Sequence, residues 1–321
     1  MWDAILGATV DSPRMQYVIK RVLGIIPVLF FTWTIVFGVI QVIPGDPVNL
    51  MLAGVPASPE VRENERRRLG LDRPILERYI TFLGRAVRGD LGESYRSRQP
   101  VAGMIAEQAG STLQLAAGGL VVGLVLGLLL GMLAGLRPNT WIDTACMIIA
   151  LAGVSLPSFW IGMILIYVFG MTLAWVPIVG SGFSALILPS ITVGLFVAGG
   201  FARLVRSSII DAMGQDYIRT ARAKGLGPAK VALKHALRNA MIPPVTLLGI
   251  QIAVLIGGAV VTENVFARPG LGTMLVEAVL NKDLPLVQAL VVYTTAAYVI
   301  VNLVVDLLYG LIDPRVQAGR A

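Results

Sequence analysis

Cysteine and histidine are almost absent from this chain of 321 residues, which has one of each, Cys146 and His235. One cysteine permits no internal disulfide, and the sequence has no C-x-x-C, H-E-x-x-H or G-x-x-x-x-G-K-S/T pattern. It therefore offers no zinc site, metalloprotease helix or phosphate-binding loop. Cys146 is interpreted as a small apolar residue and His235 as a surface residue on a cationic segment, so no catalytic, metal or cofactor site is predicted.

Charge is also scarce. Charged residues make up 14% of the chain and apolar residues 56%, compared with roughly 25% and 45–50% in soluble domains. The mean hydropathy is +0.77. This composition disfavours a soluble enzyme, because so much apolar surface cannot be hidden in one core. A net charge of +7 suggests a nucleic-acid partner in a soluble chain, but here most of the excess lies in one segment, and no nucleic-acid partner is predicted.

Five long stretches contain no Asp, Glu, Lys or Arg, and each is long enough to cross a bilayer as a helix. They are residues 22–45, 108–136, 144–202, 239–262 and 284–305. The third can hold two spans, separated by the turn-forming residues 175–182. The first is longer than a signal-peptide core and is interpreted as a retained span. The sequence thus predicts an all-α integral membrane protein with six transmembrane helices, over 18–42, 112–136, 145–172, 184–206, 241–262 and 287–309.

Basic residues indicate the orientation. Segment 203–238 has eight Lys and Arg against two Asp, a net charge of +6, and the positive-inside rule places it in the cytoplasm. Both termini, residues 1–17 and 311–321, are then cytoplasmic as well. Segment 43–110 lies outside; its apolar recurrence predicts a helical element, either a solvated lid or a docking surface for another protein.

Glycines recur at every fourth position in the second span: Gly119, Gly123, Gly127, Gly131 and Gly135. Small residues at this spacing let a neighbouring helix approach closely, so we expect a packing face. A pore lining or a hinge is the alternative. The five charge-free stretches offer no charged side chain to bind a coupling ion, so the energy for transport is expected to come from elsewhere.

The loop at 207–240 divides into two short helices. Gly225 and Gly227 are expected to end the first helix and Pro228 to begin the second. In the second helix one face is apolar, and its residues are Ala229, Leu233, Ala236, Leu237 and Ala240. Lys230, Lys234 and Arg238 form another face. The pair of helices fits either a groove on a soluble partner or an anionic lipid surface.

These residues resemble the EAA loop of binding-protein-dependent ABC importer permeases, in the form found in the dipeptide, oligopeptide and nickel group. The pattern D-Y-x-R-T-A-R-A-K-G, followed by H-x-L-R-N-A, runs here from Asp216 to Gly225 and from His235 to Ala240. Further matching pieces follow in order: Pro44–Pro47, Leu69–Asp72 with Pro74, Gly89–Gly92 with Ser94, Val265–Phe266, Arg268–Gly272, Asp283–Pro285, Asn302, Asp306, Tyr309 and Asp313–Arg315.

The resemblance implies the type I ABC importer permease fold with a core over 108–310, in a multi-pass protein of a bacterial or archaeal inner membrane. It implies a transport subunit, not an enzyme. The expected partners are a second homologous permease, two ATPase subunits that bind ATP and Mg, an extracytoplasmic binding protein and membrane lipid. The residues implied to form the ATPase-coupling helix are Tyr217, Arg219, Thr220, Ala221, Arg222, Ala223, Lys224, Gly225 and Leu226. Candidate flexing points are Gly153, Pro157, Gly199 and Gly200.

The substrate predicted from the resemblance is a di- or oligopeptide. Glutathione, nickel or an oligosaccharide are alternatives within the same architecture; the absence of a His or Cys cluster in the spans favours peptides over nickel. A self-contained channel or an ion-coupled carrier is the alternative from another class. No residue of the substrate path is predicted.

Overall fold

The computed structural model describes residues 13–42, 46–52, 57–180 and 182–312. Within these residues the regular elements are helices, together with one isolated bridge between Glu93 and Pro100. The chain forms two compact units, which are described separately. Unit 1 takes in the described residues of 1–110 and 273–321, and unit 2 is residues 111–272. The expectations for residues 1–12, Pro44, Gly45 and 313–321 lie outside the described residues.

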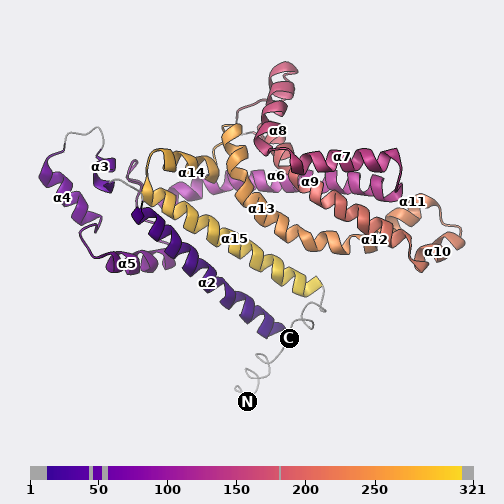
Figure 1. The fold of residues 1–321 in the computed structure, drawn as a ribbon, viewed down its shortest axis with the longest axis horizontal. Helices are drawn as coiled ribbons and strands as arrows, with labels where there is room; N and C mark the ends of the chain where they lie inside the picture. Colours follow the sequence, from indigo (N-terminus) through magenta and orange to yellow (C-terminus); the bar gives the residue numbers. More distant parts are fainter. Residues whose placement is uncertain (1–12, 43–45, 53–56, 181, 313–321) are drawn as a thin grey trace, which may run out of the picture. The chain divides into compact units, whose positions relative to one another are not determined.

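Unit 1 is built around two long apolar helices. Its elements are α2 (Pro13–Val42), α3 (Pro47–Met51), α4 (Pro59–Arg68), α5 (Ile75–Val87), the start of α6 (Val101–Leu136), most of α14 (Leu271–Leu280) and α15 (Leu284–Ile312). Helix α15 packs along α2, as Figure 1 shows. Ser58 caps α4 by accepting a hydrogen bond from the Val61 N–H at 3.3 Å, and Pro59 occupies the first turn.

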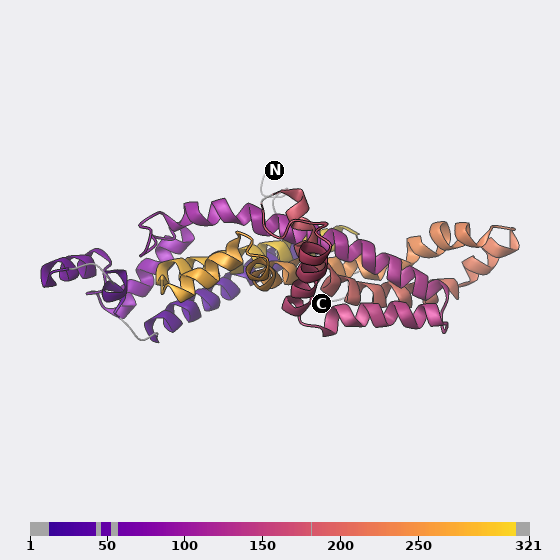
Figure 2. The ribbon, with the colours of Figure 1, turned by 90° about the horizontal axis from the view of Figure 1, so that it is seen from above.

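Unit 2 is organised around α9 (Phe183–Met213), which contacts α7, α8, α12 and α13. Its other elements are the rest of α6, α7 (Trp141–Ser155), α8 (Ser158–Leu165), η1 (Ile166–Thr172), α10 (Asp216–Ala223), α11 (Pro228–Lys230), η2 (Val231–Ala236), α12 (Leu237–Ala240) and α13 (Ile242–Val265). Figure 2 shows the magenta to orange helices of this unit side by side. Because α9 is the most buried of the apolar helices, it is the central element of the unit.

Four of the described helices are long and apolar enough to cross a membrane. These contain the stretches Arg21–Val42, Val101–Leu136, Phe183–Met213 and Leu284–Val305. The pair formed by α7 and the segment Ser158–Thr172 makes a fifth if it counts as one bent span. Helix α13 has 24 residues, but some of its side chains lie outside the description. The count of six therefore remains a prediction.

The helix expected over 145–172 is interrupted in the structure. Helix α7 ends at Ser155, α8 begins at Ser158, and the two directions differ by 108° (Figure 1). Leu156 has extended backbone angles, φ −82° and ψ 138°. A residue before proline is driven out of the helical region by the proline ring, so Pro157 accounts for the break. Of the candidate flexing points, Pro157 alone lies at this bend.

The glycine face of α6 lies against α9. A Cβ atom placed on Gly123 would lie 2.6 Å from the Cβ of Val197, and one on Gly131 would lie 2.6 Å from the Cβ of Val205. Gly119, Gly127 and Gly135 face Val193, Phe201 and Ile209 in the same way. Such distances are shorter than carbon atoms tolerate, so the two backbones can approach this closely only because the α6 positions lack side chains.

Two of the glycines considered as flexing points also lie at a helix contact. A Cβ on Gly153 of α7 would lie 2.5 Å from the carbonyl oxygen of Leu195 on α9, and a Cβ on Gly199 of α9 would meet the carbonyl of Ala150 on α7. Close packing of α7 on α9 therefore accounts for both glycines without a hinge.

Candidate functional site

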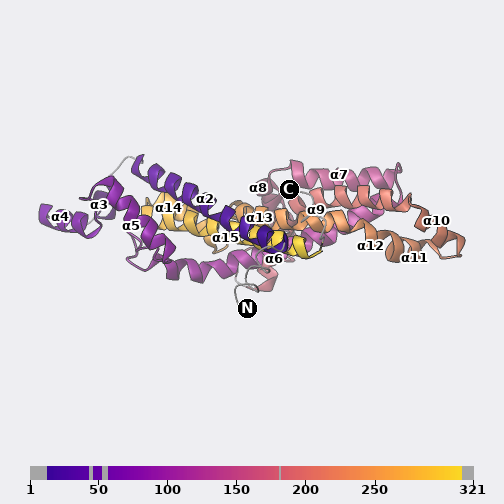
Figure 3. The ribbon, with the colours of Figure 1, turned by 90° about the horizontal axis from the view of Figure 1, so that it is seen from below.

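The segment that carries the family-like motif follows α9 directly. Helix α9 ends where the Gly214 N–H donates to the carbonyls of Ile210 and Asp211, each at 3.3 Å. Helix α10 starts two residues later, at Asp216, and Figures 1 and 3 place it at one end of unit 2. The motif thus lies at the end of the most buried helix of the unit.

Gly225 terminates α10. Its φ is +76°, in the left-handed region that favours glycine. The Gly225 N–H donates to the Arg222 carbonyl at 2.9 Å, and the Leu226 N–H donates to the Ala221 carbonyl at 3.3 Å. This pair of bonds is a Schellman cap. Gly225 is a helix-ending residue as expected, whereas Gly227 has φ −65° and instead precedes Pro228 at the start of α11.

The inner face of α10 is anchored in a core shared with α9. Ile218 and Ala221 are buried, Ala221 with 5% of its surface exposed. They belong to one cluster of buried residues with Ile209 and Ala212 of α9, and Val231 of η2. Partly buried side chains from α6 pack against the same cluster: Leu124, Leu128, Met132 and Leu136. Helix α10 is therefore packed onto the helices of unit 2.

The outer face of α10 is exposed and basic. Tyr217 is 38% exposed, and the other predicted coupling residues that are exposed are Arg219, Thr220, Arg222, Ala223, Lys224 and Gly225. Arg219 lies 3.6 Å from Asp216 in an exposed ion pair. Leu226 is half-buried and packs against the core described above. This division leaves a cationic surface available to a partner.

The second half of the loop differs from the expected pattern. Ala229 and Leu233 were assigned to the apolar face but are exposed, while Val231 and Ala232 are buried beside Ala236. The cause is a π-helical turn over Val231–Ala236. Hydrogen bonds from residue i to i+5 widen the turn and rotate the buried face away from the positions that an α-helix would bury. The expected basic residues Lys230, Lys234 and Arg238 are exposed.

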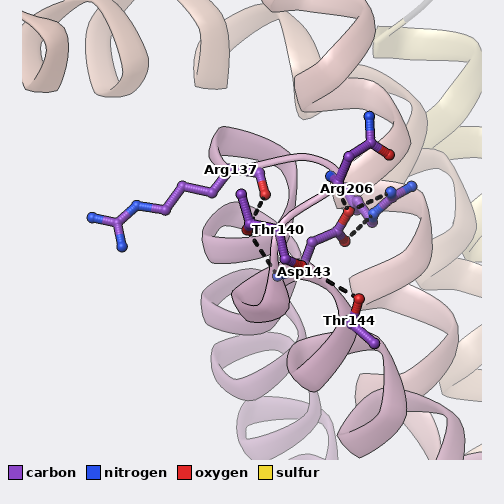
Figure 4. Close-up of polar contacts among 6 residues, drawn as sticks. Arg137, Thr140, Asp143, Thr144 and Arg206 are labelled. Atoms are coloured by element: carbon purple, nitrogen blue, oxygen red, sulfur yellow. Dashed lines mark hydrogen bonds and ion pairs between the residues drawn. The ribbon is translucent and has the colours of Figure 1, made fainter.

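An ion pair between a buried carboxylate and a partly exposed arginine joins α7 to α9 (Figure 4). Arg206 Nε donates to Asp143 Oδ1 at 2.6 Å, and Arg206 Nη2 donates to Asp143 Oδ2 at 2.7 Å. The Asn139 N–H also donates to Asp143 Oδ2, at 2.9 Å. The side chains of Asp143 and Arg206 are 6% and 29% exposed. Thr140 caps α7 by accepting from the Asp143 N–H at 3.4 Å.

Sequence reasoning missed this pair. Asp143 directly precedes the charge-free stretch 144–202, and Arg206 follows it by four residues; Arg206 was counted only in the net charge of segment 203–238. The available signal was that an acid precedes this stretch and two arginines, Arg203 and Arg206, follow it, all on the side predicted to be cytoplasmic. In the structure the bidentate geometry fixes the start of α7 against α9.

A second buried carboxylate, Glu263, organises the motif at 268–272. Glu263 has no exposed surface. It accepts hydrogen bonds from Thr112 Oγ1 at 2.6 Å and from the Gly272 N–H at 2.7 Å. Thr112 Oγ1 in turn accepts from the Leu271 N–H at 2.8 Å. The carboxylate thus caps the first amides of α14, and a Cβ on Gly270 would collide with it.

Unit 1 contains a polar cavity of about 1010 Å³. Its lining includes six arginines and three carboxylates: Arg66, Arg67, Arg68, Arg73, Arg78, Arg85, Asp46, Asp90 and Glu93. Five of these six arginines form ion pairs with carboxylates among the described residues, with N···O distances below 4 Å; Arg78 is the exception. Burial raises the pKa of Tyr95, on the same wall, to about 12, although the charge of Arg78 acts in the opposite direction.

The single cysteine and the single histidine lie in different helices. Cys146 is buried in α7, and His235 is half-buried in η2. Among the described residues, no group of three or more His, Cys, Asp or Glu side chains is placed to hold a metal ion.

Comparison with known families finds two matching models. Residues 127–318 match the family described as binding-protein-dependent transport system inner membrane component. Residues 14–116 match the N-terminal model of binding-protein-dependent transport system membrane components. Together the two matches extend over most of the chain.

Several relatives are similar over nearly their whole length. The glutathione transport system permease protein GsiC of Escherichia coli O6:H1 is 44% identical over 304 residues, which are 94% of this chain and 99% of that protein. The proteins of the same name from E. coli K12 and Shigella dysenteriae serotype 1 match with the same identity and coverage. A crystal structure of an amino acid ABC transporter with histidines matches with a TM-score of 0.49 and 15% identity, covering 66% of this chain and 93% of that one. A likeness this distant supports no argument about the present chain.

Proposed function

Since this chain belongs to the family of binding-protein-dependent inner-membrane transport components, and is a multi-pass permease subunit of an ABC importer and not an enzyme, we propose that it imports a short peptide. Glutathione is the first candidate. The support is the 44% identity to permeases named for glutathione transport. Glutathione is itself a tripeptide, so the name of these relatives and the peptide substrate expected from the sequence point to one chemical class.

The energy for import is proposed to come from partner subunits. The stretches assigned to the spans have no charged side chain that could bind and release a coupling ion. Asp143, which directly precedes one of these stretches, is neutralised by Arg206. Two ATPase subunits would bind ATP and Mg, a second permease would complete the pathway, and an extracytoplasmic binding protein would deliver the peptide. This chain would bind no cofactor.

The single structural observation that carries the coupling proposal is the core shared by α10 and α9. Ile218 and Ala221 of α10 lie in the same buried cluster as Ile209 and Ala212 of α9. Protein interiors are close-packed and resist compression, so a partner that displaces α10 must also displace the end of α9. The exposed residues Arg222 and Lys224 would then meet acidic groups on the ATPase, each contributing about 1 kcal/mol or less.

Motion of α9 would reach α7 through the ion pair of Arg206 with Asp143. ATP binding would draw the ATPases and the two coupling helices together and turn the permease toward the outside, and hydrolysis would reverse the change. This is a two-state movement of packed elements. The break at Pro157 lets α7 and α8 change their mutual angle without disrupting either helix.

The proposed orientation follows from charge. Residues 203–238 carry the net charge of +6 that is typical of a cytoplasmic loop, and this supports an orientation in which α10 would lie on the side where ATP is available. Both termini would also be cytoplasmic, and residues 43–110 would lie outside.

The substrate proposal is tested by competition. The complex of this chain with its partner subunits and binding protein is reconstituted in vesicles, and ATP-driven uptake of labelled glutathione is measured with an excess of unlabelled dipeptide, nickel or oligosaccharide. We expect unlabelled glutathione, and more weakly a dipeptide, to reduce the uptake. ATP-driven uptake of nickel or an oligosaccharide, with none of glutathione or dipeptide, would contradict the proposal.

A further inference from the structure

One face of α5 exposes large apolar side chains. Ile75, Leu76, Ile80 and Val87 are between 61% and 77% exposed. Leu76, Ile80 and Val87 follow the i, i+4, i+11 spacing that puts residues on one side of a helix. Soluble surfaces rarely carry such a stripe without something that covers it.

The neighbouring face of α5 is fixed to the span α2. Tyr79 shares a hydrogen bond with the hydroxyl of Thr34 at 2.6 Å, and Phe37 lies between Tyr79 and Phe82, with ring centroids 5.3 and 5.6 Å apart. Thr34 precedes Val42, the last residue of α2, by eight positions, or roughly 12 Å along the helix. Helix α5 therefore lies beside the membrane-crossing stretch of α2 and not beyond its end.

The polar face of α5 has a separate environment. Arg78, Thr81 and Arg85, at i, i+3 and i+7, line the cavity of unit 1 together with Asp46 and Asp90. Two of the three charged residues of α5 thus line a polar cavity, and the third, Glu77, pairs with Arg73. The apolar stripe is exposed. A helix with this division is suited to lie in the plane of a membrane interface.

The surface of the neighbouring helix α2 indicates what covers the apolar stripe of α5. Its own exposed apolar residues include Phe31, Ile35, Val39 and Val42, between 55% and 81% exposed. In a protein that crosses the membrane, an exposed apolar stripe on a span faces lipid. The geometry points to a second lipid contact, continuous with that of α2: α5 is an interfacial helix of the outer leaflet, with Leu76, Ile80 and Val87 against the acyl chains. This goes beyond the transport function proposed above and does not depend on the substrate.

The experiment uses the native complex and a chain whose only cysteine, Cys146, is replaced by alanine. A single cysteine is introduced as Leu76→Cys or Ile80→Cys and labelled with an environment-sensitive fluorophore. Ile35→Cys on α2 is the lipid-facing control, and Glu60→Cys on the exposed, charged helix α4 is the aqueous control. Each labelled complex is placed in vesicles of phosphatidylcholine with and without bromine on the acyl chains.

We expect brominated lipid to reduce the fluorescence at Leu76 and Ile80 as much as at Ile35, and aqueous iodide to reduce it far less than at Glu60. Quenching by iodide alone would show a solvated lid. Quenching by neither agent would show that a second subunit or the binding protein covers the stripe. Either result overturns the inference, and neither bears on whether the complex imports peptide, which uptake by the unlabelled complex reports.

Discussion

Asp143, at the start of α7, and Arg206, in the last third of α9, form a two-point ion pair with N···O distances of 2.6 and 2.7 Å. The two residues are 63 positions apart in sequence and join helices that otherwise meet through glycines and apolar side chains. The proposed path from α10 through α9 to α7 therefore includes one specific polar link, and that link can be broken without altering the packed surfaces.

Removal of one partner should destabilise the fold, because the other charge is left with fewer hydrogen bonds. We expect Asp143→Asn and Arg206→Gln each to lower the free energy of unfolding by about 1–3 kcal/mol. The double variant should lose less than the sum of the two. Thermal unfolding of the purified complex measures the cycle. Strict additivity of the two effects would show that the residues do not interact.

The glycine face of α6 predicts a contrast within one helix. Gly131→Leu should destabilise the protein by about 1–3 kcal/mol or more, because its Cβ would lie 2.6 Å from the Cβ of Val205. Gly103→Leu is the matched control, since no atom lies within 4 Å of its Cβ position and leucine favours a helix. The yield of folded protein and its melting temperature compare the two. Equal tolerance of both changes would favour a pore lining or a hinge over packing.

The coupling proposal predicts that α10 binds the ATPase less well when its inner face is disrupted. Ala221→Asp places a carboxylate in a buried position without an arranged partner, so α10 should leave its site on α9. Gly225→Pro should have the same effect, because proline cannot adopt φ +76°. The chain should stay in the membrane while less of the ATPase co-purifies with it. Ala229→Asp, at an exposed position of the same loop, is the control, and normal co-purification with Ala221→Asp and Gly225→Pro would argue against the coupling assignment.

The cap on α14 predicts that Glu263 is needed as a hydrogen-bond acceptor. Glu263→Ala leaves the Gly272 N–H and Thr112 without their acceptor in a buried site, and should cost about 1–3 kcal/mol. Glu263→Gln keeps one acceptor oxygen and should cost less. The exposed neighbour Asn264→Ala serves as the control. Unfolding measurements that rank Gln no better than Ala would indicate that the negative charge itself is what the site requires.

The long helices could be predicted from the sequence for a physical reason. A helix that crosses lipid cannot carry unpaired charge, so the charge-free stretches cover most of α2, α6, α9 and α15. Their ends were harder to predict. Helix α6 begins at Val101, earlier than the expected residue 112, because its first turns continue past Glu107, which lies outside the charge-free stretch. The cap at Gly225 was predictable because it depends on local backbone geometry.

The polar contacts were not predictable in the same way. Glu263 and Thr112 are 151 positions apart, and Asp143 and Arg206 are 63 apart. Hydrogen bonds of this kind depend on how helices pack, and the spacing of residues along one helix carries no information about it. The π-helical turn over Val231–Ala236 has a similar origin, because propensity favours an α-helix there and tertiary packing decides otherwise. A sequence pattern can thus predict a coupling segment without predicting the contacts that pack it onto α9.

The most direct test of the account is ATP-driven uptake in proteoliposomes of defined composition. One set contains this chain alone, and the other contains the chain with the second permease, the two ATPases and the binding protein. The account predicts peptide uptake only in the complete set, only with ATP on the side of α10, and loss of that uptake with Ala221→Asp. Uptake of peptide by this chain alone, without ATP, would contradict it.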